Sequence, residues 1–237
     1  MKVLLYGRFG EYANKVERLV KSYGLEILDP STQLGMTTPD VVVTVGGDGT
    51  LIGAERDFPG VPKLPLRDSN FCFHCSTLSN EEILKRLSYG KMITKNYLKI
   101  QATIGGKKFL SLNDFVIRNK IQTAALRFNI TVNREPVYHE PLIGDGVVIA
   151  SPFGSTGYFF SITRTPFTSG IGLAFNNIHN LEKRFEVAPE DATIEITITR
   201  GPGQFSSDNN PEIIELVEGD KIIITKSPKP AQLLVPA

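Results

Sequence analysis

The feature of this sequence that constrains the fold most is the segment VVVTVGGDGT at residues 41–50. Its first half is a run of β-branched residues without polar alternation, which predicts a strand buried on both faces, as in a parallel sheet. Gly46, Gly47 and Gly49 then leave a turn whose bare N–H groups form an anion-binding concavity. We therefore expect a phosphate-binding turn with one carboxylate, Asp48, and one hydroxyl, Thr50. The alternative is a tight strand-to-helix turn without a ligand.

The bulk composition excludes several classes of function. The formal net charge is +1, from 26 basic and 25 acidic residues, whereas a sequence-independent nucleic-acid binder needs a clear basic excess. No apolar run approaches the roughly 18 residues of a membrane span. The start, MKVLLYGRFG, lacks the apolar length and cleavage pattern of a secretory signal. We expect a cytoplasmic protein with no nucleic-acid or membrane partner.

The two cysteines, Cys72 and Cys75, form a single C-x-x-C pair. Such a pair is either redox-active or half of a zinc site. No second pair exists, and the nearest histidine, His74, lies between the two cysteines. We expect buried thiols, which is the usual state of free cysteine.

The N-terminal part alternates strands and helices, which predicts an α/β layer. We expect strands at 2–6, 25–28, 41–45 and 64–66, and helices at 11–23, 51–56 and 80–89. The last helix has a capping box, with Ser79 followed three residues later by Glu82. The first domain is predicted to span residues 1–90.

Residues 91–237 read as short strands at regular spacing, which is typical of an all-β sandwich or barrel. We expect strands at 97–104, 107–117, 124–132, 137–138, 147–150, 193–199, 212–217 and 221–226. The tail from residue 227 holds three prolines. It is expected to add an edge strand at 232–235, with the final strand or tail able to pack back on the N-terminal domain.

Two further loops combine hydroxyl, amide and carboxylate groups. The first is SLND at 111–114, where Asn113 has the donor–acceptor pair that suits an adenine edge. A carboxylate at Asp48 or Asp114 suits the vicinal hydroxyls of a ribose. The second is GDGVVIASPFGSTGY at 144–158, in which Ser155 or Thr156 is expected to cap a helix that binds anions at its N-terminus.

Several charged residues near the predicted strand ends have two interpretations. Arg8, Lys63 and Arg67 would neutralise phosphates there. The alternative for each is ordinary surface charge.

These motifs together resemble the NAD kinase family. The resemblance rests on GGDGT at 46–50, the Asn113–Asp114 pair and GDGVVIASPFGSTGY at 144–158, in that order. The first motif also occurs in lipid kinases of the diacylglycerol type and in phosphofructokinases, whereas the third is peculiar to NAD kinases. The resemblance implies a Rossmann-like α/β domain followed by a β-sandwich domain. It also implies a homodimer or homotetramer in which a neighbouring subunit completes the NAD site.

Carried over residue by residue, the resemblance makes Asp48 the catalytic aspartate, which would orient or deprotonate the ribose 2′-hydroxyl of NAD. The donor phosphates would lie on Gly46, Gly47, Gly49 and Thr50. The residues implied to bind NAD are Asn113 and Asp114 at the adenine and ribose, Asp145 near the nicotinamide half, and Ser155, Thr156 and Tyr158 in the Gly-Ser-Thr turn. No protein metal ligand is implied, because Mg²⁺ would bind through the phosphates of ATP.

Three segments depart from the family pattern. The loop that borders the nicotinamide pocket is replaced by residues 66–73, and later stretches are replaced by 162–166 and 175–179. The resemblance implies an enzyme that phosphorylates NAD to NADP with ATP or polyphosphate and a divalent metal. The alternatives are a kinase of the same fold that acts on another hydroxyl, in a nucleoside, sugar or lipid, and a non-catalytic nucleotide-binding module.

Overall fold

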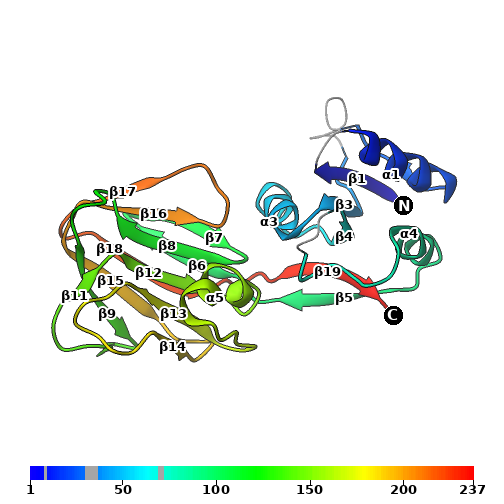
Figure 1. The fold of residues 1–237 in the computed structure, drawn as a ribbon. Coiled ribbons are helices and arrows are strands. Elements are labelled where there is room, and N and C mark those ends of the chain that lie inside the picture. The colour runs from blue at the N-terminus through cyan, green and yellow to red at the C-terminus, as the bar shows by residue number, and fades with distance from the viewer. Residues whose placement is uncertain (8–9, 30–36, 69–71) are drawn as a thin grey trace. The chain divides into compact units, whose positions relative to one another are not determined.

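The computed structural model describes residues 1–7, 10–29, 37–68 and 72–237. The chain divides into two compact units, Met1–Tyr97 with Pro230–Ala237, and Leu98–Lys229 (Figure 1). Strand β5 (Met92–Tyr97) belongs to the first unit because it pairs along its whole length with the C-terminal strand β19 (Ala231–Pro236). The boundary that the sequence places at residue 90 lies before this strand.

The first unit is built on one six-stranded sheet. Its strand order is β2 (Glu26–Ile27), β1 (Lys2–Gly7), β3 (Val41–Gly46), β4 (Lys63–Arg67), β19, β5. Neighbouring strands are parallel from β2 to β19, and β5 runs antiparallel to β19. The strand expected at 232–235 forms as β19, but its expected edge position is wrong, because β19 lies between β4 and β5. Its buried side chains, Ala231 and Leu233, explain why an internal position suits it.

Helices cover both faces of this sheet, as the apolar run at 41–45 predicts. Every residue of β3 is buried. Val41, Val43 and Val45 pack in one cluster with side chains of α1 (Glu11–Ser22) and α4 (Asn80–Ser88), and Val42 packs in another with Ala54 of α3 (Asp48–Asp57). Alternate side chains of β3 therefore face different helices.

Two helix starts can be compared with their predictions. The capping box at α4 is confirmed, since the Glu82 N–H donates to Ser79 Oγ at 3.1 Å. Helix α3 begins earlier than residue 51, because Gly47 is its N-cap and the Thr50 N–H donates to the Gly47 carbonyl at 3.0 Å. Asp48, Gly49 and Thr50 therefore form the first turn of the helix rather than a separate loop.

The second unit is a β-sandwich. Its first sheet contains β10 (Glu135–Pro136), β9 (Leu126–Val132), β15 (Ile194–Arg200), β18 (Lys221–Lys226), β6 (Ile100–Ile104) and β7 (Lys107–Ser111), with β11 (Leu142–Gly144) also paired to β9. Its second sheet contains β14 (Phe185–Ala188), β13 (Ile171–Asn176), β12 (Gly146–Ala150), β8 (Asp114–Asn119), β16 (Gly203–Ser207) and β17 (Ile214–Leu216).

The sandwich core lies between these two sheets. Alternate residues of β15, such as Ile194 and Ile196, share one buried cluster with Phe115 and Ile117 of β8. This pattern confirms the predicted fold class, an α/β layer followed by a β-sandwich.

The predicted strand at 107–117 is broken at a point that matters for the site. The chain leaves the first sheet at the end of β7 and enters the second sheet at Asp114. Leu112 and Asn113 make the crossing. The loop predicted at SLND, 111–114, falls at this break, whereas the apolar residues on both sides of it predict one continuous strand over 107–117.

In the described part of the chain, the structure contains no helix with the length and apolar character needed to cross a membrane.

One charged pair is buried beneath the first sheet. Lys63 on β4 is fully buried, and its ammonium donates to Glu55 of α3 and to the Phe58 carbonyl. Both interpretations of Lys63 made from the sequence, phosphate neutraliser and surface charge, are therefore wrong. The pair joins helix α3, which carries Asp48, to the sheet.

We expect Lys63→Ala to lower the free energy of unfolding by about 3–5 kcal/mol, because Glu55 would remain buried without its counter-charge. Lys21→Ala is the matched control, since it breaks an exposed pair with Glu17 in the same unit and should cost less than about 1 kcal/mol. Urea denaturation of the three proteins measures both changes. Equal losses in the two variants would contradict a special role for the buried pair.

Candidate functional site

The glycine turn at the end of β3 is shaped by a close contact. A Cβ built on Gly46 would lie 2.2 Å from Thr50 Oγ1, so only glycine fits there. Gly49 differs, because it is exposed and no described atom lies within 4 Å of a Cβ built on it. Packing within the described chain therefore does not explain why residue 49 is a glycine. The N-terminus of a helix is suited to an anionic ligand.

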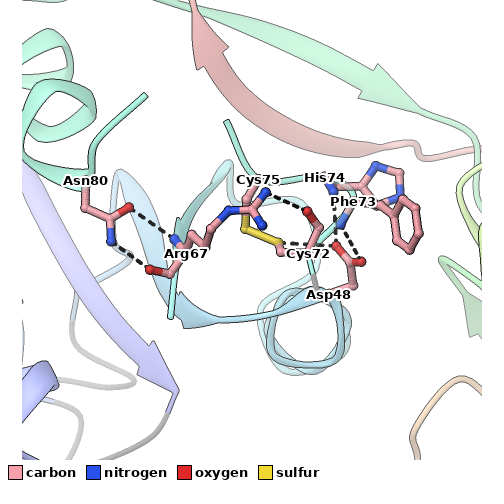
Figure 2. Close-up of a disulfide and its surroundings, with 7 residues drawn as sticks. All are labelled: Asp48, Arg67, Cys72, Phe73, His74, Cys75 and Asn80. Atoms are coloured by element: carbon pink, nitrogen blue, oxygen red, sulfur yellow. Dashed lines mark hydrogen bonds between the residues drawn. A yellow bond between two sulfur atoms is a disulfide. The ribbon is translucent and has the colours of Figure 1, made fainter. Parts of the chain in front are cut away.

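Asp48 lies at the first position of α3, half-buried, and its carboxylate is held by a neighbouring turn (Figure 2). The Phe73 N–H donates to Oδ2 at 2.9 Å, and the His74 N–H donates to Oδ1 at 3.2 Å. Both oxygens thus accept a backbone hydrogen bond. The side chain is oriented before any ligand arrives.

The turn that holds Asp48 is closed by a disulfide between Cys72 and Cys75 (Figure 2). The expectation of two buried thiols is wrong. The two Cα atoms are 5.4 Å apart, which lies within the usual range for a disulfide, so the C-x-x-C spacing brings the sulfurs together. Cys72 Sγ lies 3.5 Å from Asp48 Oδ1.

Arg67 fastens the same turn to the end of β4. Its guanidinium donates to the Cys72 carbonyl at 2.9 Å. The Asn80 side chain in turn accepts from the Arg67 N–H at 3.1 Å and donates to the Arg67 carbonyl at 2.9 Å. The structure thus assigns Arg67 a structural contact that the sequence did not predict. Arg8, the other arginine expected near phosphates, lies outside the described residues.

In the second unit, the crossing between the two sheets is organised by Asp208, to which the sequence assigned no role. Its carboxylate accepts hydrogen bonds from Ser111 Oγ and from the N–H groups of Leu112, Asn113 and Asp114, at 2.5 to 3.1 Å. The Asp208 N–H also donates to the Asp114 carbonyl at 2.9 Å. The only signal in the sequence was the polar run Asp-Asn-Asn at 208–210.

The structure brings the Asn113–Asp114 pair beside the Gly-Ser-Thr turn. The Ser151 N–H donates to the Asn113 carbonyl at 2.8 Å, and a Cβ on Gly154 would lie 2.2 Å from that same carbonyl oxygen. A Cβ on Gly157 would lie 3.4 Å from Asn113 Nδ2 and 3.9 Å from Asp114 Oδ2. Glycine at 154 is therefore required for this close approach, whereas a Cβ on Gly157 would make ordinary contacts with these two atoms.

The expectation that Ser155 or Thr156 caps a helix is wrong. Both residues lie in the 3₁₀ turn η1 (Gly154–Thr156), and α5 (Tyr158–Thr163) has Gly157 as its N-cap, without a side-chain hydrogen bond. Ser155 is buried and Thr156 half-buried. The reason is that Gly157, which has no side chain, occupies the N-cap position from which a hydroxyl would cap α5.

Asp145 and Tyr158 both contact residues at the end of β13. Asn177 Nδ2 donates to Asp145 Oδ2 at 2.8 Å, and Asn176 Nδ2 donates to the Tyr158 hydroxyl at 3.4 Å. A cavity of about 560 Å³ opens beside them, and its lining includes Tyr158, Asn176, Asn177, Lys183 and Arg184. This volume lies in the range of small-molecule sites.

Among the residues that the structure describes, no group of three or more His, Cys, Asp or Glu side chains is placed to hold a metal ion.

The buried carboxyl of Asp114 has a strongly raised pKa. Burial raises it from 3.8 to about 7, and the negative charge of Asp208 adds to the rise. Burial also raises the pKa of Asp208, although its four hydrogen bonds oppose that shift. The folded sandwich therefore favours a proton on Asp114 at pH values where the unfolded chain has lost it.

A raised carboxyl pKa stabilises the folded state below the unfolded pKa, and this contribution is lost as the pH rises through the folded pKa. The free energy of unfolding of the wild-type protein should therefore fall between pH 4 and pH 7. We expect Asp114→Asn to make this fall smaller. The difference between the two proteins over this range should reach about 4 kcal/mol at most. Urea titrations at several pH values measure it, and parallel curves for the two proteins would contradict the raised pKa.

Comparison with known proteins identifies the family. Residues 112–235, more than half of the chain, match the family model for the ATP-NAD kinase C-terminal domain. An NAD kinase from Wolinella succinogenes is 24% identical over 247 residues, which cover 94% of this chain and 84% of that protein. An NAD kinase from Nitrosospira multiformis is 27% identical, with 84% and 71% covered.

Two solved structures share the fold over the whole chain. Yeast NADH kinase, solved in complex with NADH, superposes with a TM-score of 0.86 at 14% identity and is covered over 84% of its own chain. An NAD kinase from Archaeoglobus fulgidus, solved in complex with ATP, gives 0.82 at 19% identity, with 94% covered. Because the family match covers more than half of the chain, including most of the β-sandwich and strand β19 of the α/β layer, the chain belongs to the NAD kinase family.

Proposed function

We propose that this protein phosphorylates the adenosine-ribose 2′-hydroxyl of NAD to give NADP, with ATP or polyphosphate as the donor and a divalent metal. The observation that carries the proposal is the oriented carboxylate of Asp48 at the N-terminus of α3, in a chain of this family. Relatives named NAD kinase support it, as do a fold neighbour solved with NADH and another solved with ATP.

The α/β unit provides the phosphoryl-transfer side. Phosphoryl transfer asks the protein mainly for positioning and for neutralisation of charge. In the proposed mechanism the backbone at Gly46, Gly47 and Gly49, with the Thr50 hydroxyl, binds the donor phosphates at the helix N-terminus. Asp48 orients the acceptor hydroxyl and accepts its proton. A positioned base of this kind contributes about 10²- to 10⁴-fold to the rate.

The β-sandwich unit provides the acceptor side. We propose that Asn113 and Asp114 bind the adenine and ribose. The protonated form of Asp114, favoured by its raised pKa, would donate a hydrogen bond, and the ionised form would accept one. The other proposed NAD contacts are Asp145, Ser155, Thr156 and Tyr158. Asp208 contributes indirectly, since it holds the backbone on which Asn113 and Asp114 lie.

The donor is proposed to enter as its magnesium complex, with Mg²⁺ bound to the phosphate oxygens rather than to a set of protein ligands. The ion would neutralise the charge that develops during transfer. We further propose a homodimer or homotetramer, and a cytoplasmic location, where NAD and ATP are both available.

We expect Asp48→Asn to lower the rate of NADP formation from NAD and MgATP by about 10²- to 10⁴-fold, since the amide cannot accept the proton. Asp57→Asn is the matched control, because Asp57 lies at the far end of the same helix and binds Tyr6 and Arg56. The assay couples NADP to an NADP-specific dehydrogenase. Circular dichroism verifies that both variants fold.

An Asp48→Asn protein that folds and works at the wild-type rate would rule out the assignment of Asp48. No NADP from the wild-type protein with either ATP or polyphosphate would overturn the proposed acceptor. A screen of nucleosides, sugars and lipids would then identify another hydroxyl.

A further inference from the structure

Residues 72–75 form a small covalent ring in contact with Asp48. The disulfide joins Cys72 to Cys75, and the two residues between them, Phe73 and His74, donate their N–H groups to the two carboxylate oxygens (Figure 2). The donors that orient Asp48 therefore belong to a segment whose shape depends on one S–S bond.

The attachment of this ring is uneven. On the Cys72 side, Arg67 and Asn80 tie the turn to β4 and α4. On the other side, Phe73 has 69% of its surface exposed, and the half-buried Cys75 lines a cavity of about 410 Å³ together with His74, Ser76, Lys95 and Tyr97. A small thiol reagent in solvent can therefore approach the disulfide from the Cys75 side.

The cysteine content of the chain supports a reversible role. These are its only two cysteines, so no other thiol competes for either partner. Disulfides in a reducing cytoplasm are uncommon, and those that occur are usually catalytic or redox-sensing. A lone disulfide that contacts the proposed catalytic carboxylate fits the redox-sensing kind.

We propose that the Cys72–Cys75 disulfide is a redox-sensitive clamp that positions Asp48, so that the oxidised protein is the faster kinase. This inference rests on the proposed function. Opening the ring takes two electrons and two protons from a dithiol, which becomes a disulfide itself, while Cys72 and Cys75 become thiols. Oxidation by a disulfide compound reverses the step.

The geometry decides the direction of the effect. Each carboxylate oxygen has two lone pairs. One hydrogen bond from a backbone N–H to each oxygen therefore fixes the carboxylate and still leaves a lone pair for the acceptor hydroxyl. When the ring opens, the segment keeps the hydrogen bond from Arg67 to the Cys72 carbonyl and the ring contact of His74 with Tyr97. It loses the covalent link that fixes how Phe73 and His74 point their N–H groups at Asp48. A misplaced catalytic group commonly costs up to about 10²-fold in rate. The loss should appear in kcat rather than in the KM for NAD.

The first experiment compares NADP formation by the oxidised protein and by protein reduced with dithiothreitol, with thiol titration to verify each state. We expect kcat to fall about 10- to 100-fold on reduction, with KM for NAD changed by less than about twofold. The double variant Cys72→Ser/Cys75→Ser is the control for direct effects of dithiothreitol on the assay. It should be as slow as the reduced protein and show no response to dithiothreitol.

A second pair of variants separates the hydrogen bond from the disulfide. Phe73→Pro keeps both cysteines but removes the N–H that reaches Asp48 Oδ2, so the oxidised variant should already have a low kcat. Phe73→Ala keeps that N–H and should retain the response to reduction. A faster enzyme after reduction, equal kcat in both states, or two free thiols after treatment with an oxidant would each overturn the clamp.

Hydrogen exchange at Phe73 and His74 distinguishes failure of this inference from failure of the proposed function. In the oxidised protein both amides should exchange slowly, and reduction or Asp48→Ala should make both exchange faster. If neither redox form makes NADP but this exchange pattern holds, the proposed reaction is wrong and the clamp on Asp48 stands. If NADP is made and the exchange rates do not respond to reduction, the clamp is wrong.

Discussion

The burial of β3 on both faces is the constraint on which the α/β unit depends. Its valines pack alternately against α1 and α4 on one side and α3 on the other, which leaves no place for charged side chains along the strand. Charged groups of this segment can therefore lie only where the strand ends. At that end, Gly46 lets the chain turn tightly against Thr50, and Asp48 begins the next helix. The buried pair of Lys63 and Glu55 then links that helix to the sheet.

In the β-sandwich, the constraint is to satisfy the backbone N–H groups where the chain crosses from one sheet to the other, at residues 111–114. Where the chain passes from one sheet to the other, Leu112 and Asn113 lie outside both sheets and Asp114 begins β8, and a buried N–H without a partner is costly. Asp208 accepts from all three. The consequence is two carboxyl groups in one buried place, which raises the pKa of Asp114. The same arrangement that completes the fold thus sets the protonation of a proposed ligand-binding residue.

The segment at 66–75 is the stretch that the sequence resemblance predicts to depart from the family pattern. In the structure, its described residues Cys72–Cys75 hold the carboxylate of Asp48 through backbone N–H groups, and Arg67 fastens them to β4. Backbone donors do not depend on side-chain identity, so an unfamiliar sequence can still orient the carboxylate. What it adds is a covalent bond beside the reacting group.

The sequence by itself determined the parts that rest on local pattern. The all-buried run at 41–45, the capping box at Ser79 and Glu82, and the alternation of apolar residues in the second half predicted strands, a helix start and the sandwich, because each depends on neighbours along the chain. The three motifs likewise identified the family. The starting point of α3 and the failure of Ser155 and Thr156 to cap α5 depend on the path of the backbone, which the residue types do not specify.

Only the tertiary structure decided which distant residues meet. Asp208 reaches the crossing at 111–114 from the far end of the second unit's chain, and Lys63 is buried because Glu55 lies across from it. The position of β19 inside the first sheet, between strands from the other end of the sequence, is of the same kind. Cys72 and Cys75 stand close in the sequence, yet their contact with Asp48 appears only when the β4 end and the start of α3 lie side by side. Partners that are far apart along the chain leave no local pattern, so no reading of spacing or periodicity could have supplied them.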